Sequence, residues 1–122
     1  MVMKETAVRI TEVRVDEDLT HLSLAGKLDL AGLQGADIKF TGYTAARRKP
    51  TLVDLAQVEF IASLGVGMLI SCAKSLHLHG AKMVLLNPSG PVESVLKTLG
   101  IDQVIPIAYS LEEGLRLLGA GA

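Results

Sequence analysis

The feature that most constrains the fold is a regular alternation of strand-like and helix-like segments in the second half of the chain. Residues Thr51–Leu55 form a short, largely apolar run without alternation, which fits a strand covered on both faces. Farther on, apolar residues recur at every fourth position, the spacing of a helix with one buried face: Leu64, Met68, Cys72 and Leu76. A strand, a helix and another strand in succession predict parallel pairing, because such crossovers join parallel strands.

The same alternation continues to the end of the chain. Residues Lys82–Leu86 predict a strand, and Pro91–Leu99 predicts a helix that ends before Gly100. Residues Gln103–Ile107 predict a last short strand. Ser110–Glu113 has the Ser-x-x-Glu pattern of a capping box, so we expect it to start the last helix.

The first part of the chain predicts a hairpin followed by a helix. Residues Ala7–Val15 are rich in β-branched side chains and Thr20–Ala25 alternates, so the two segments should pair as antiparallel strands. The alternation changes phase between Ile10 and Val13, which predicts a bulge or a turn. Residues Leu30–Arg48 are expected to be helical.

These segments give the order β-β-α-β-α-β-α-β-α and an α/β fold. We expect a single mixed β-sheet of four to five strands with helices packed on it. The 122 residues are expected to form one domain over residues 1–122, with its core at about residues 7–118. Hydrophobic residues make up 49% of the chain and aromatic residues only 3%, so the core must be mainly aliphatic.

Composition and charge argue against several classes of function. The formal net charge of −1 offers no broad basic field for nucleic acid, and the basic run Arg47–Lys49 is best explained as a solvated helix end. The apolar run near Ile70 is broken by Ser71 and Lys74 and is too short to insert into a membrane. The lone Cys72 cannot form an internal disulfide and no signal-peptide pattern is visible, so we expect a cytoplasmic location.

No set of residues suited to catalysis or metal binding is visible. His77 and His79 are two residues apart, a spacing that does not put them on one helix face, and no cysteine or glutamate cluster completes a zinc site. Asp29 and Asp54 lack the nucleophile and base of a catalytic set. The stretch Gly65–Gly67 lacks the lysine of a phosphate-binding loop. We therefore expect no enzyme activity, no metal and no cofactor.

Ser63 stands directly before the helical stripe and predicts an N-cap. Its hydroxyl would then lie beside the unpaired backbone N–H groups of the helix start. A phosphate there would add about −1.5 to −2 charge at pH 7 and would gain from the helix dipole. Ser63 is therefore a candidate switch in a docking surface, although a plain cap is the commoner role of such a serine.

Three segments carry a resemblance to a known family. Gly26–Asp29, Leu52–Leu55 and Val58–Leu69, in this order and spacing, resemble the STAS domain family, whose small stand-alone members include the bacterial anti-sigma factor antagonists. The resemblance extends over about residues 8–118.

The resemblance implies a phosphorylation switch and a protein partner. In the family antagonists, a serine at this position is phosphorylated by a kinase that is also the anti-sigma factor. The unmodified antagonist binds that kinase and frees the sigma factor, and the phosphorylated form dissociates. Carried over, Ser63 is the phosphorylation site, and the surface that binds the anti-sigma factor or serine kinase comprises Asp29, Ala62, Ser63, Leu64 and Gly65.

The motif departs from the family pattern, so two other functions stay open. The family core is commonly Asp-Ser-Ser-Gly, whereas this chain has Ala62-Ser-Leu-Gly65 and lacks the acid that could help a kinase. One alternative is a STAS module of a transporter or sensor complex without phosphorylation, and another is a small-ligand or nucleotide-binding domain. A homodimer through the predicted hairpin is also open, although the charges of Arg9, Glu12 and Arg14 disfavour it.

Overall fold

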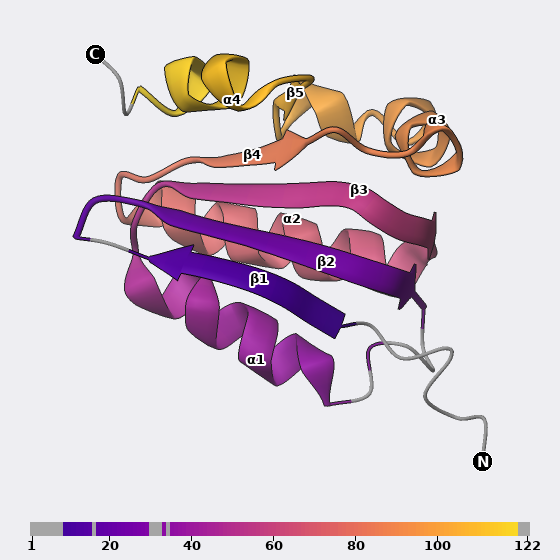
Figure 1. Cartoon of the computed structure of the whole chain (residues 1–122), viewed down its shortest axis with the longest axis horizontal. Coiled ribbons are helices and arrows are strands. Elements are labelled where there is room, and N and C mark those ends of the chain that lie inside the picture. The colour runs from indigo at the N-terminus through magenta and orange to yellow at the C-terminus, as the bar shows by residue number, and fades with distance from the viewer. Residues whose placement is uncertain (1–8, 16, 30–32, 34, 120–122) are drawn as a thin grey trace.

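The computed structural model describes residues 9–15, 17–29, 33 and 35–119, and these form one five-stranded mixed sheet flanked by helices (Figure 1). The strands lie in the order β1-β2-β3-β4-β5; β1 pairs antiparallel with β2, and every later pairing is parallel. The strands are β1 (Arg9–Val15), β2 (Thr20–Leu28), β3 (Thr51–Ile61), β4 (Met83–Leu86) and β5 (Ile107–Ala108). The helices are α1 (Ala36–Tyr43), α2 (Ser63–Leu78), α3 (Gly90–Thr98) and α4 (Leu111–Leu118), with short 3₁₀ helices η2 (Ala45–Arg47) and η3 (Ile101–Gln103). The predicted α/β class and element order are confirmed.

Helices cover both faces of the sheet. The larger core contains residues of α1, α2 and α3 packed on one face, including Phe40, Leu69, Leu76 and Leu96. A smaller core on the other face joins α4 to β3, β4 and β5. In Figure 1, α2 lies behind β2 and β3, whereas α4 lies beside β4 and β5. The core is aliphatic apart from Phe40, as the composition predicts.

Two strands are longer than the sequence predicts. The predicted strand Thr51–Leu55 continues in β3 to Ile61, and the predicted strand Thr20–Ala25 continues in β2 to Leu28. The two ends pair in parallel, with Leu28 opposite Ile61. The apolar pattern of the strand stops where its side chains become exposed, which are those of Ala56, Gln57, Glu59 and Phe60. The backbone nevertheless keeps its pairing, because strand pairing does not depend on the exposed side chains.

Two other boundaries differ from the prediction. Of the predicted strand Gln103–Ile107, only Ile107 lies in a strand, since β5 is Ile107–Ala108. Gln103 ends η3, and residues 104–106 form a turn that leads to β5. The predicted helix Leu30–Arg48 is shorter, since α1 spans Ala36–Tyr43 and its continuation tightens into η2. Its expected start at residues 30–32, like the expected strand start at residue 7, lies outside the described residues.

The irregularity predicted in the first strand is confirmed. The pairing of β1 with β2 shifts between Ile10 and Glu12, inside the interval in which the alternation changes phase. The strand β1 lies at the edge of the sheet, so a homodimer through this edge stays an open alternative.

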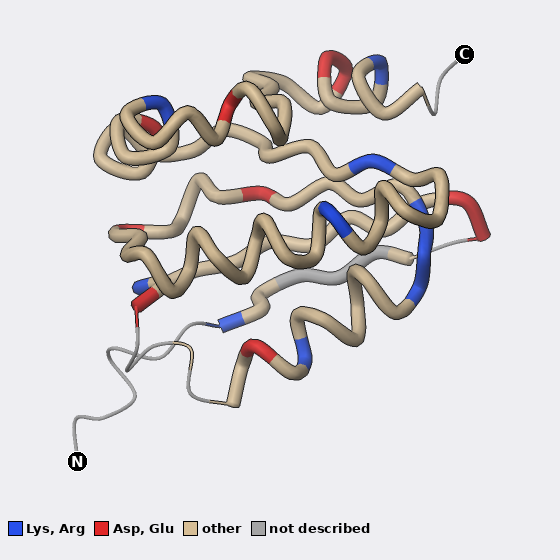
Figure 2. The backbone as a smooth tube through the Cα atoms, turned by 180° about the vertical axis from the view of Figure 1, so that it is seen from behind, with Lys and Arg blue, Asp and Glu red and all other residues tan. Residues whose placement is uncertain are grey.

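Charged residues are interspersed along the described backbone, as Figure 2 shows. The guanidinium group of Arg47 donates to the hydroxyl of Thr20 and, over 3.3 Å, to the carbonyl of Leu19. This residue of the basic run therefore ties the turn before β3 to the start of β2. Among the described residues, none of the helices is long and apolar enough to cross a membrane.

Candidate functional site

The predicted site residues lie at the end of the sheet where β2 and β3 stop. Asp29 and Ala62 each follow directly after the paired residues Leu28 and Ile61. The backbone N–H of Ala62 donates to the carbonyl of Leu28 over 2.9 Å, so the chain still bridges the two strands as it enters α2. Parallel pairing thus brings together two segments that are more than thirty positions apart in the printed sequence.

Gly65 allows α2 to approach β2 very closely. A Cβ atom at this position would lie 2.6 Å from the carbonyl oxygen of Leu28 and 2.7 Å from its Cβ atom. Side chains do not approach backbone so closely, so the position requires glycine. Gly65 is buried and faces the sheet, so it positions the site rather than offering surface to a partner.

Ser63 is the first residue of α2, not its N-cap as predicted. The N-cap is Ala62, whose backbone is extended at φ −110° and ψ 175° and which offers no side-chain hydrogen bond. The first intrahelical bond runs from the N–H of Val66 to the carbonyl of Ala62. The N–H groups that precede Val66 in the first turn of α2 have no carbonyl partner within the helix, so they are available to an anion.

The surface beside Ser63 is exposed and partly apolar. Ser63 itself is exposed, and Leu64 and Phe60 retain 50% and 47% of their accessible surface. Asp29 and Ala62 are half-buried. Phe60 was not among the predicted site residues, because the predicted strand ended at Leu55. The signal available in the sequence was an aromatic residue next to the motif in a chain with only 3% aromatic residues.

A groove of about 350 Å³ lies between α1 and α2 and includes Ser63. Its lining residues come from α1, from the start of α2 and from Leu33: Leu33, Asp37, Thr41, Ser63, Leu64, Gly67, Met68, Ser71 and Cys72. The hydroxyl of Thr41 lies 3.7 Å from the sulfur atom of Cys72. Cys72 is buried, as the sequence predicts, so the groove exposes mainly hydroxyl groups, one carboxylate and apolar side chains.

The other residues considered for chemistry do not join this site. Asp54 lies opposite Ser23 in the middle of β3, and its carboxylate accepts from the N–H of Ala56 over 2.9 Å. His77 lies at the far end of α2, and the ring of His79 contacts the carbonyl of Ser75 in its own helix. Within the described ranges, no three His, Cys, Asp or Glu side chains gather as a metal site would require.

Similarity to other proteins agrees with this geometry. The family model of the STAS domain matches residues 11–114. An anti-sigma factor antagonist from Mycobacterium paratuberculosis superposes with a TM-score of 0.80 at 18% identity, over 93% of this chain and 96% of that one. A STAS domain protein from Planctomyces limnophilus gives a TM-score of 0.75 at 21% identity, over 88% and 97% of the two chains.

A third similar structure is the Bacillus cell fate determinant SpoIIAA in its phosphorylated form. It has a TM-score of 0.60 at 22% identity, and the match covers 90% of this chain and 97% of that one. No curated protein matches the chain in sequence. At these identities the solved structures establish the fold, while the family model covers most of the sequence. The chain therefore belongs to the STAS domain family.

Proposed function

We propose that this chain works by binding a protein partner, an anti-sigma factor or serine kinase, and that phosphorylation of Ser63 controls the binding. The observation that carries the proposal is the exposed hydroxyl of Ser63 at the first residue of α2. In this role the chain itself would catalyse no reaction. The similar fold of SpoIIAA, solved in a phosphorylated form, supports a switch of this kind.

The binding surface we propose consists of Phe60, Leu64, Ser63 and the half-buried Asp29 and Ala62. Exposed apolar side chains beside a modifiable hydroxyl suit a protein interface, because they exclude water around the group that changes. A phosphate on Ser63 would place about −1.5 to −2 charge at pH 7 into this surface, next to the segment of Asp29. Desolvating that charge at an apolar interface is costly, so the partner should dissociate.

The helix would tolerate the modification. A phosphate at the first turn of α2 lies near unpaired N–H groups and the positive end of the helix dipole. Gly65 and the bond from Ala62 to Leu28 hold this turn on β2 without using the Ser63 side chain. The modification should therefore change the surface and leave the fold in place.

The first experiment is intact mass spectrometry with peptide mapping on the chain purified from its native cells. The proposal expects one phosphate on Ser63 in a fraction of the molecules. An unmodified Ser63 under every growth condition tried would favour instead a constitutive STAS module of a transporter or sensor complex.

A second experiment tests binding with a matched charge control. The tagged chain is used to co-purify its partner, and Ser63→Asp is compared with Ser94→Asp, which adds the same charge at an exposed position on α3. We expect Ser63→Asp to lose most of the partner and Ser94→Asp to retain it, with closely similar thermal midpoints. Equal recovery by Ser63→Asp and wild type would contradict the proposal.

A third experiment addresses the missing acid of the motif. Ala62→Asp restores the acid before the serine, and Ala62→Asn supplies an equally good helix cap without the charge. With the co-purified kinase and ATP, Ala62→Asp should be phosphorylated faster than wild type, and Ala62→Asn should not. Equal rates for all three chains would show that the acid has no part in recognition.

A further inference from the structure

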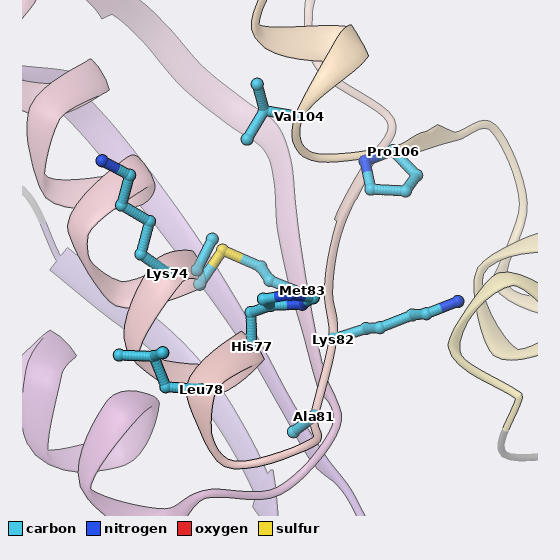
Figure 3. A pocket seen from close by; sticks show the side chains of 9 residues that line it. Lys74, His77, Leu78, Ala81, Lys82, Met83, Val104 and Pro106 are labelled. Carbon is cyan, nitrogen blue, oxygen red and sulfur yellow. The ribbon is translucent and has the colours of Figure 1, made fainter.

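A second concave surface lies at the other end of α2. It is a hollow of about 480 Å³, bounded by the last turns of α2, the start of β4 and the segment that follows η3. Figure 3 shows Lys74, His77 and Leu78 on the α2 side and Val104 and Pro106 on the other side, with Met83 between them. The hollow has the size of a site for a small ligand. Its lining on α2 begins at Ala73, about 15 Å along the helix from Ser63.

The chemistry of the lining is selective. Six apolar residues form the walls, and the only polar side chains of the lining are the cationic or basic Lys74, His77 and Lys82. None of the nine lining residues carries a carboxylate, an amide or a hydroxyl group. A sugar or another polyhydroxylated molecule would find few side-chain partners here, and a cation would find no carboxylate in the lining.

The walls are also unusually exposed for apolar side chains. Leu78 retains 81% of its accessible surface and Val104 retains 61%. Large exposed apolar side chains that border one hollow indicate a surface that an apolar body covers. Met83 lies between them, and a methionine adapts its shape to what packs on it. In Figure 3 the side chains of Lys74 and Lys82 lead away from the hollow in opposite directions. Each is a flexible stem, so rotation of either side chain brings its ammonium group to an anion at the rim.

We propose that this hollow binds an amphipathic monocarboxylate, a small organic acid with a linear apolar tail. The tail lies on Met83 between Leu78 and Val104, and the carboxylate meets Lys74 or Lys82 at the rim. This site goes beyond the proposed function and does not depend on Ser63.

The test is a titration of the isotope-labelled chain with octanoate, below its micelle concentration, followed by amide chemical shifts in NMR. We expect saturable shifts in Ala73–Leu78, at Met83 and at Val104. The neutral 1-octanol and the cationic octylammonium have the same tail and should bind several-fold more weakly. Shifts scattered over unrelated exposed apolar residues, or equal affinity for octanoate and 1-octanol, would overturn the proposal.

Variants on the rim locate the site. Lys74→Glu with Lys82→Glu should weaken octanoate binding about tenfold, since each replaces an exposed attraction with a repulsion. Lys39→Glu on α1 makes the same charge change outside the lining and should have no effect. An equal loss in Lys39→Glu would show a non-specific charge effect and would overturn the site.

A second pair of variants tests the apolar wall. Val104→Asp puts a carboxylate on the rim and should weaken binding, whereas Leu99→Asp changes a similarly exposed residue, at 55%, that does not line the hollow. Ser63→Asp should bind octanoate like wild type. A failure of octanoate binding would leave the Ser63 switch standing, and the absence of a phosphate on Ser63 would leave this site standing.

Discussion

The helices α2 and α4 both begin beside a serine, and their first turns are held in opposite ways. At α4, the hydroxyl of Ser110 accepts from the N–H of Glu113 over 3.1 Å, and the Glu113 carboxylate accepts from the N–H of Tyr109. At α2, the N-cap is Ala62, whose side chain makes no capping hydrogen bond. The backbone bond to Leu28 and the close packing of Gly65 hold it instead. The serine of α4 stabilises the fold, and that of α2 stays available for function.

The largest effect on this difference between α2 and α4 is expected from a change in the packing of Gly65. Gly65→Ala should lower the free energy of unfolding by about 1–3 kcal/mol, because its Cβ meets the backbone of Leu28. Gly67→Ala is the matched control, since a Cβ there meets nothing within 4 Å, and it should gain about 0.5–1 kcal/mol in helix propensity. Urea unfolding measures both. Equal effects would mean that α2 is not held by this contact.

The two serines give the next largest effect. Ser110→Ala should cost about 1 kcal/mol of stability, because it removes the cap of α4. Ser63→Ala should change stability by less than about 0.5 kcal/mol, as is usual for exposed positions without such a role. Thermal and urea unfolding of the two variants side by side test the difference. A larger loss for Ser63→Ala would show that its hydroxyl stabilises α2 after all.

Adding a cap to α2 should make the two helix starts more alike. Ala62 has the extended backbone of an N-cap residue, so Ala62→Asn should accept a hydrogen bond from the first turn and raise stability by about 0.5–1 kcal/mol. The shift of the urea midpoint is the measurement. No gain would indicate that the half-buried position cannot seat the amide.

The smallest expected effect on stability concerns the contact between α3 and Tyr109, which lies between β5 and α4. The hydroxyl of Tyr109 donates to the carboxylate of Glu93, and Lys97 lies 3.3 Å from that carboxylate. The Tyr109 hydrogen bond first, and then the hydrogen bond and charge of Lys97, hold the pKa of Glu93 below its ordinary value. The associated stability is therefore present above the ordinary pKa of a glutamate and is lost as the pH falls through the lowered folded value.

Tyr109→Phe should raise the pKa of Glu93 and remove part of this pH dependence. An NMR titration of the Glu93 carboxyl carbon measures the shift, and Tyr43→Phe on α1 serves as the control. An unchanged pKa in Tyr109→Phe would assign the lowering to Lys97 instead.

The sequence predicted what periodicity and turn chemistry determine. The element order, the bulge near Ile10, the capping serine at Ser110 and the left-handed Gly100 after α3 were all predicted and are confirmed. The boundaries that failed, the end of β3 and the extent of β5, depend on backbone pairing with strands distant in sequence. Local patterns carry no information about such pairing.

The candidate site was predicted in part. Only the family resemblance, and no local pattern, grouped Asp29 with Ala62–Gly65, because parallel pairing brings them together across the α1 crossover. The predicted N-cap was wrong by one residue, since the strand continues to Ile61 and leaves Ala62, not Ser63, as the N-cap of α2. The hollow at the far end of α2 had no sequence signal, because its lining comes from three separate segments.

The pairing of Leu28 with Ile61 has a consequence for when the switch surface exists. The two strand ends can meet only after the intervening chain has closed, which makes this a non-local contact that forms slowly in folding. A newly made or unfolded chain carries the same serine without the helix end, the glycine contact or the neighbouring strand. A partner that recognises this surface would thus distinguish finished molecules from unfinished ones, in addition to modified from unmodified ones.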